Sequence, residues 1–373
     1  MEIIHSHEAK FKKYTITQQI LQILQSVAIT SSNPENPLFA LPIHEILFEI
    51  IDLCKDDDVT IYVLDTFTAI FTNPILGADK LEFTIENSKY IESIFHQYEA
   101  VSSFIVKEKL INLFSLAIHS QIARETLPTN LEFFSSALLA IIKSGNVPDY
   151  GDLFDLVFAL CLNDTVMLFY CTDKELITIV NEQLKYGLNK ASISAMALAN
   201  KFCDHNNDLC EVFFTREVLE KTRSLIYNVE TDSDMITISR CLEYYRTNQN
   251  QMFLDVFLFP IARYFKNLQH RAIRHLIVFF GQHLDEFLKS DVADEYKTAV
   301  FSQIIDEIFE LPQEQTITML LSLCTQYDSM KLFVNQAFVE NEFEESLVSN
   351  LTSENEEISS LCQILLDKMH SDS

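Results

Sequence analysis

The chain has 373 residues, of which 48% are apolar, and a formal net charge of −27 at pH 7. So large an excess of acidic residues disfavours binding to nucleic acid or to anionic membrane surfaces, because such binding depends on Lys and Arg side chains. The acidic balance suits a basic protein partner, or it serves solubility alone. Only five glycines and eight prolines are present, which favours helices over strands, because strands need frequent turn residues.

Taken in chain order, the apolar periodicity predicts a first amphipathic helix over 14–30. A loop with two prolines follows, and Pro42 suits the first position of a helix that runs to about residue 54. The three aspartates at 56–58 then begin a helix that ends near Asn73, because acidic residues stabilise a helix N-terminus. The same periodicity predicts further helices near 85–99, 101–119, 129–144, 149–162, 173–187, 189–203, 216–229, 232–247, 250–265, 268–280, 292–310, 313–326, 337–350 and 355–369.

Several residues mark the ends of these helices. Asp173 and Thr231 suit N-terminal caps, because their side-chain oxygens can accept hydrogen bonds from unpaired backbone N–H groups. Gly145 and Gly187 suit helix C-termini. Pro260 lies inside a helical pattern and is expected to kink or split the helix there.

A short motif also recurs: an apolar residue and a Cys, a polar stretch with Asp or Asn, and then a Phe. It occurs at Leu160-Cys161 with Phe169, at Phe202-Cys203 with Phe213, and at Leu323-Cys324 with Phe333. The spacing is close to one or three steps of about forty residues, and a period of about 40 to 47 residues is typical of armadillo and HEAT repeats. The sequence therefore predicts an all-α, right-handed armadillo/HEAT-like solenoid of about seven repeats.

We expect this solenoid to be a single array over 1–373. Helices over 1–60 would form the N-terminal cap, 61–336 the repeats, and 337–373 an acidic C-terminal capping unit with a polar outer face. The eight cysteines lie mostly in apolar helical stretches, which indicates reduced, buried thiols and a cytoplasmic, possibly also nuclear, protein.

The sequence contains no pattern that indicates catalysis. A phosphate-binding loop and a nucleophile elbow are both missing, and we expect no catalytic, cofactor-binding or metal-binding residues. Cys203, Asp204, His205 and Cys210 could supply metal ligands, but no second matching pair accompanies them, so a polar loop between helices is the preferred interpretation. A protein-binding scaffold is thus favoured over an enzyme with an unfamiliar carboxylate or thiol site.

The best candidate for a partner-binding surface is a cationic stretch. Residues 256–284 contain no Asp or Glu, although they contain Arg271 and Arg274, which share a helix face. Arg240 and Tyr244 form a comparable stripe on the preceding helix, and an exposed Tyr beside an Arg is typical of interface hot spots. We expect these four residues to lie on one concave stripe that binds a partner. The alternatives are ion pairs between the arginines and acidic residues of adjacent repeats, and a Tyr244 ring packed over the next helix.

The carboxyl-terminal part carries a family resemblance. The run Leu311-Pro-Gln-Glu-Gln315, then Leu320–Cys324, Lys331–Phe333 and Phe338–Glu340, resembles the last repeats of the HEAT/armadillo chaperones that assemble the base of the proteasome regulatory particle. This family includes the fungal Hsm-type chaperone and the animal non-ATPase subunit five. The resemblance covers about 80 residues, and this chain would have to lack about two of the family's repeats.

The resemblance implies a non-catalytic, cytosolic chaperone. Its concave surface would bind the small helical C-terminal domain of one proteasomal ATPase subunit until the ring is built, and the acidic charge would steer a basic partner domain. The alternative is a generic armadillo-repeat adaptor or regulator for another protein. Transport receptors of this class place Trp-Asn pairs along the groove, and the absence of Trp disfavours that version of the alternative.

Overall fold

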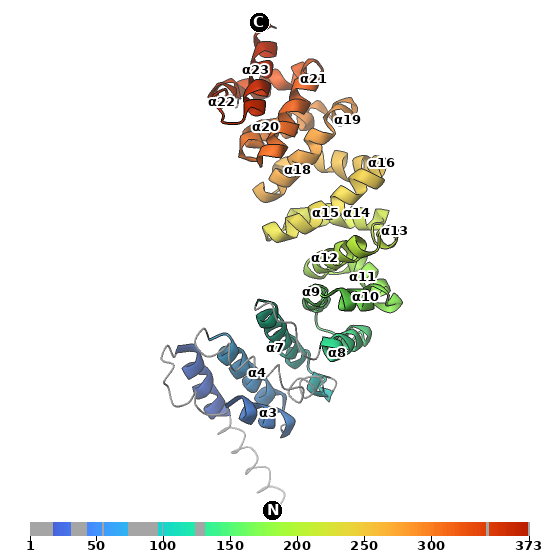
Figure 1. The fold of residues 1–373 in the computed structure, drawn as a ribbon, viewed down its shortest axis with the longest axis vertical. Helices are drawn as coiled ribbons and strands as arrows, with labels where there is room; N and C mark the ends of the chain where they lie inside the picture. Colours follow the sequence, from blue (N-terminus) through green and yellow to red (C-terminus); the bar gives the residue numbers. More distant parts are fainter. Residues whose placement is uncertain are drawn as a thin grey trace, which may run out of the picture. The chain divides into compact units, whose positions relative to one another are not determined.

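The structure, a computed structural model, describes residues 18–30, 43–53, 56–73, 96–98, 100–123, 131–340 and 343–371. These residues form helices joined by short connections and contain no strand, which confirms the predicted all-α class for this part of the chain (Figure 1). The internal contacts divide the chain into two compact units, Met1–Asn207 and Asp208–Ser373.

In the first unit, the described helix over 18–30 packs along α4 (Asp57–Phe71). Two side chains link these helices: Thr66 Oγ1 donates to the Leu21 carbonyl at 3.4 Å, and Asn73 Nδ2 donates to the Ala28 carbonyl at 2.7 Å. The helices α3 (Ile43–Leu53) and α7 (Phe104–Ala123) also pack on α4. A buried apolar face on α4 therefore organises the start of the chain.

The rest of the first unit is built from helices that pack on one another. They are α8 (Leu131–Lys143), α9 (Tyr150–Leu160), α10 (Asp164–Cys171), α11 (Lys174–Tyr186) and α12 (Asn189–His205). The most extensive contact joins α9 and α12, with α11 packed on α12 and α8 packed on α9. Fully buried aromatic side chains, such as Tyr170 and Phe202, fill the space between these layers.

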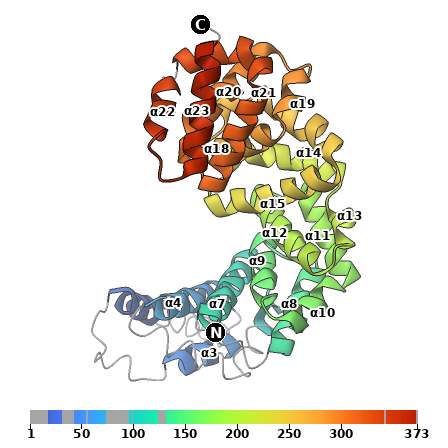
Figure 2. The same cartoon turned by 45° about the horizontal axis from the view of Figure 1, so that its top comes forward.

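The second unit contains the larger set of helices. They are α13 (Leu209–Phe213), α14 (Arg216–Leu225), η1 (Ile226–Asn228), α15 (Asp232–Asn248), α16 (Asn250–Met252), η2 (Phe253–Leu258), α17 (Phe259–Ala262), η3 (Phe265–Asn267), α18 (His270–Gln282), α19 (Leu284–Lys289), α20 (Asp294–Glu307), η4 (Ile308–Glu310), α21 (Gln313–Glu340), α22 (Phe343–Asn350) and α23 (Glu356–Ser371). The helix α18 packs on α15, α20 and α21, while α22 and α23 pack on α21 (Figure 2).

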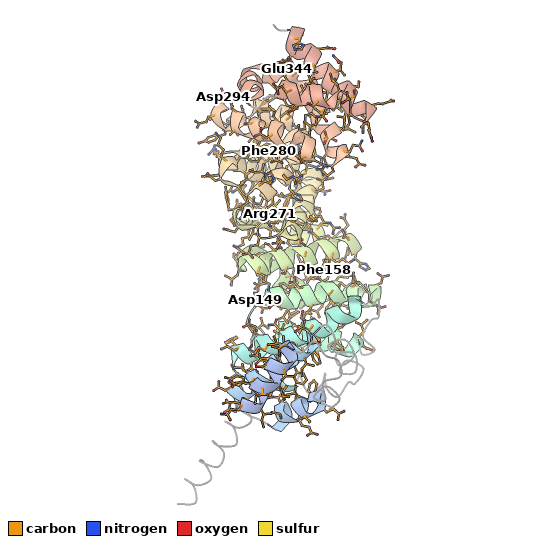
Figure 3. The ribbon with its side chains drawn as sticks, turned by 90° about the vertical axis from the view of Figure 1, so that its left-hand side faces the viewer. Asp149, Phe158, Arg271, Phe280, Asp294 and Glu344 are labelled. Atoms are coloured by element: carbon orange, nitrogen blue, oxygen red, sulfur yellow. The ribbon has the colours of Figure 1, made fainter. Side chains whose placement is uncertain are left out.

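Phenylalanine rings form the centre of the second unit. Phe280 of α18 is fully buried, and its ring centroid lies 4.8 Å from that of Phe287 and 5.3 Å from that of Phe265 (Figure 3). These rings come from α18, α19 and η3, so one cluster ties together three consecutive segments. Aromatic pairs at such distances add to the stabilisation that burial alone provides.

Four of the predicted helix ends are confirmed, whereas Pro42 lies outside the described residues. Asp173 accepts a hydrogen bond from the Leu176 amide at 2.9 Å, and Thr231 forms a capping box with Asp234 at the start of α15. Gly145, beyond the end of α8, has φ of 66°, a left-handed conformation that glycine adopts without strain. Gly187 is the C-cap of α11, although its backbone is extended rather than left-handed.

Three short helices were not predicted from the sequence: α10, α13 and α19, each of eight residues or fewer. Segments of this length show too few apolar repeats to reveal a helical period. The sequence also predicted a break between helices over 313–326 and 337–350. This break is absent, because α21 continues without interruption from Gln313 to Glu340. This stretch has neither Gly nor Pro, so its polar residues after Cys324 lie within a helix rather than in a loop.

Candidate functional site: a groove lined by arginines

A groove of about 980 Å³ lies on the second unit between α15, α18 and the start of α21. The helix α18 packs on both α15 and α21, and its remaining face, which neither helix covers, lines the groove. The buried face of α18 carries Ala272, Ile273, Leu276, Ile277 and Phe280, and the opposite face carries its two arginines.

Three of the four residues of the predicted stripe line this groove. Arg240 comes from α15, and Arg271 and Arg274 come from α18, together with Val278 on the same helix face (Figure 3 labels Arg271). Arg240 precedes the other two arginines by 31 and 34 residues, and the packing of α15 on α18 brings them to one surface. Their role in binding a partner stays a prediction.

Tyr244, the fourth residue, is not part of the groove lining. Its half-buried ring packs on Phe214, with 4.9 Å between ring centroids, and lies beside Tyr245 at 5.9 Å. Tyr244 is therefore a packed ring, as the alternative interpretation proposed. Its neighbour, however, precedes α15 in the chain and does not belong to the next helix. Phe214 lies between α13 and α14, where periodicity gave no sign of this contact.

The two arginines of α18 reach in different directions. Arg271 donates to the backbone carbonyl of Glu230, just before the N-cap of α15. Arg274 donates from Nη2 to the backbone carbonyl of Glu310 at 2.6 Å, and its Nε lies 3.7 Å from Glu307 Oε2. The expected ion pairing with adjacent helices thus occurs at Arg274, whereas the hydrogen bond of Arg271 goes to a neutral backbone group.

Histidines form the second set of polar groups at the groove. His270 Nδ1 lies 2.9 Å from Glu307 Oε1, and the Glu307 side chain is only 11% exposed. His275 Nδ1 lies 3.2 Å from Ser239 Oγ across the contact between α18 and α15. Burial lowers the pKa of His275, the neighbouring Arg274 lowers this pKa further, and Asp232 partly opposes both. The His275 imidazole is therefore neutral at pH 7.

Sequence reasoning did not identify the Ser239–His275 pair, because the two residues are 36 positions apart. A Ser–His contact becomes a nucleophilic pair when a third group orients the imidazole. Among the described residues, no carboxylate hydrogen bond to the His275 ring is found. We interpret the contact between Ser239 and His275 as a polar link that joins α15 to α18.

Acidic groups are few at the groove. Glu243 accepts two hydrogen bonds from Arg246, and in one of them the distance from Arg246 Nε to Glu243 Oε2 is 2.9 Å. The lining contains three arginines and two histidines but only two acidic residues, Asp232 and Glu243. In the whole chain, by contrast, acidic residues outnumber Lys and Arg by 54 to 27. The groove therefore presents forked N–H donors, which match carboxylates geometrically.

All but one of the cysteines in the described part of the chain are buried, the exception being the half-buried Cys203. No group of three or more His, Cys, Asp and Glu side chains is arranged for a metal there. Cys203, Asp204 and His205 lie in the last turn of α12 rather than in a loop, and Cys210 belongs to α13. Burial raises the pKa of Cys161 to about 12, which keeps this thiol protonated and unreactive.

In the residues that the structure describes, no helix is both long enough and apolar enough to span a membrane. Comparison of the sequence with models of protein families and with curated proteins finds no match.

Proposed function

We propose that this chain is a non-catalytic protein-binding scaffold, and that the groove between α15, α18 and α21 is its docking surface. The architecture we propose is a right-handed armadillo/HEAT-like solenoid of about seven repeats, acting in the cytoplasm. One observation carries the proposal: Arg240, Arg271 and Arg274 come from two helices and converge on one groove in a chain that is acidic overall. Convergent cations on a repeat-like helical surface suit recognition of another protein.

The partner that we propose is a subunit of the proteasomal ATPase ring, whose C-terminal domain the chain would bind during assembly of the regulatory-particle base. The support is the resemblance of residues 311–340 to the chaperones of that base. The first residues of this segment also contribute to the groove, since Leu311, Pro312 and Gln315 all line it. The segment with the resemblance and the cationic surface therefore meet at the same place.

Affinity purification of the tagged full-length chain, followed by mass spectrometry, tests this proposal. We expect a proteasomal ATPase subunit to be recovered with the natural chain and to be depleted about tenfold, or about 1.4 kcal/mol, with the double variant Arg240→Glu/Arg271→Glu. A matched control is Arg216→Glu/Arg263→Glu, which makes the same change of charge at two exposed positions outside the groove lining.

Recovery of a different protein that depends equally on the groove would replace the proteasomal partner and keep the scaffold. Equal recovery of every partner by the groove variant and by the control would show that docking occurs elsewhere. Purified chain that turns over a substrate at a described site would contradict the non-catalytic role.

A further inference from the structure

We infer that the groove takes an acidic segment of its partner that also carries apolar side chains, rather than a basic segment. This inference rests on the proposed function, because it names the chemistry of the segment that docks. The whole chain, at −27, suggests the opposite preference. Charges at contact distance decide, however, because salt screens exposed charges beyond about 8 Å at physiological ionic strength.

Arg271 is held at the groove by a partner without formal charge. Its hydrogen bond goes to the carbonyl of Glu230, which has no formal charge, so the bond orients the guanidinium without neutralising it. A guanidinium has five N–H donors, and one carbonyl uses only part of that capacity. Arg271 thus stands at the groove as a pre-positioned donor for a carboxylate, and Arg240 faces the same space from α15.

Few acidic groups at the groove could cancel the charge of Arg271. Glu243 is bound by Arg246, outside the groove lining. Glu307 is nearly buried behind the lining and is held by His270 and Arg274. Asp232 is the remaining acidic residue of the lining, and it lies in the first turn of α15, where a carboxylate stabilises the helix.

The groove also presents apolar surface. Ile236 is 54% exposed and lies one turn before Arg240 on α15. Val278 lies one turn after Arg274 on α18, and Pro312 is exposed at the start of α21. Apolar groups thus stand next to cationic groups on each wall. A segment with alternating acidic and apolar side chains satisfies both, whereas a basic segment would meet like charges.

Fluorescence anisotropy with the full chain and two synthetic peptides tests this inference. One fluorescein-labelled peptide contains repeats of two glutamates, a leucine and a phenylalanine, and the other has lysines in place of the glutamates. We expect the acidic peptide to bind at least about tenfold more tightly than the basic one. Arg240→Glu/Arg271→Glu should remove that preference, and the control Arg216→Glu/Arg263→Glu should retain it.

A second variant guards against a folding defect in the first. Ile236→Asp adds an acidic group to an exposed position of the groove, so it should weaken acidic-peptide binding about tenfold while the melting temperature stays unchanged. Tighter binding of the basic peptide, or acidic-peptide binding that neither groove variant weakens, would overturn the inference. If a natural partner docks at the groove through a basic segment, the proposed function stands and the inference is wrong. If neither peptide nor partner depends on the groove, both are wrong.

Discussion

At the scale of single residues, Arg271 and Arg274 look equivalent in the sequence but have different surroundings. Arg271 binds one backbone carbonyl, whereas Arg274 binds the Glu310 carbonyl and lies beside the nearly buried Glu307 carboxylate. Removing a partner from a carboxylate of low exposure costs more than removing one from a surface ion pair, because the remaining charge loses its compensation. Substitution of Arg274 should therefore mainly reduce stability, whereas substitution of Arg271 should mainly reduce binding.

We expect Arg274→Glu to lower the free energy of unfolding by about 2 kcal/mol, since it places a second carboxylate beside Glu307 and removes a charged hydrogen bond. Arg271→Glu should cost less than about 1 kcal/mol. Urea unfolding of the two single variants makes the comparison. Equal losses, or a larger loss for Arg271→Glu, would contradict this assignment of roles.

A second residue-scale prediction concerns His283, which follows α18 and is 7% exposed. Neither ring nitrogen has a hydrogen-bond partner among the described residues, and Glu286 Oε1 is 3.8 Å from Nδ1. Burial lowers the pKa of His283 below its ordinary value of 6.5; Arg246 lowers this pKa too, whereas Glu286 and Glu243 raise it. A depressed histidine pKa favours folding while the ring is neutral, so this contribution is complete above about pH 6.5 and is lost as the pH falls toward the folded-state pKa.

Stability measured by urea unfolding should therefore decline below about pH 6.5, and His283→Leu should flatten this decline. The variant should also not lose stability at pH 7, because it removes two unsatisfied buried nitrogen atoms. Glu286→Gln serves as the directional control. Loss of that carboxylate lowers the pKa of His283 further, so the decline should extend to lower pH. An unchanged profile in His283→Leu would exclude this residue as its source.

At the scale of helices, the segment from Asn250 to Ala262 shows how a proline is accommodated. The sequence predicted a kink or split at Pro260, yet the helical path continues through it as α16, a π-helical turn over Phe253–Leu258 and α17. In an α-helix the amide of residue 260 would donate to the carbonyl of Val256, and proline has no N–H. Arg223 of α14 donates to that carbonyl instead, from Nη1 at 2.9 Å.

This replacement predicts a measurable coupling between Arg223 and Pro260. Arg223→Ala should lower the free energy of unfolding by about 1 to 3 kcal/mol in the natural chain, because it leaves the Val256 carbonyl without its charged donor. In a Pro260→Ala background the loss should be smaller, because the new amide can donate to Val256. A double-mutant cycle of urea unfolding measures the difference. Additive effects of the two substitutions would contradict the coupling.

At the scale of the whole molecule, the chain forms two compact units, Met1–Asn207 and Asp208–Ser373, each with its own buried apolar residues. The second unit also contains a tight contact between helices at Gly281 of α18. A Cβ atom there would overlap the side-chain end of Met319 of α21, which is itself buried. This contact supports two walls of the groove.

We expect chemical unfolding to show two transitions, because two separate cores need not unfold together. Gly281→Ala should shift only one of them, by about 1 to 3 kcal/mol, since it overpacks the second unit alone. Hydrogen exchange followed by mass spectrometry assigns each transition to its peptides. A single transition that moves as a whole would contradict independent cores.

The sequence by itself determined the helices and most of their ends. Apolar spacing and side-chain caps act within a few residues, so Asp173, Thr231 and Gly145 carry their own local signal. Ile238, Cys241, Leu242 and Tyr245 recur at helical spacing and lie on the buried face of α15, whereas Arg240 is exposed. The same periodicity failed for α10, α13 and α19, which are too short to show a period, and for α21, where polar residues remain inside a helix.

Only the tertiary structure decided which of the exposed residues share a surface. The predicted stripe forms for Arg240, Arg271 and Arg274, because α15 packs on α18, but the tertiary structure excludes Tyr244 from it. The same packing brings Ser239 to His275, and contact with the segment before α14 turns Tyr244 onto Phe214. Sequence periodicity fixes the face of a helix on which a side chain stands, whereas the neighbour of that face depends on how whole helices pack, which no short pattern encodes.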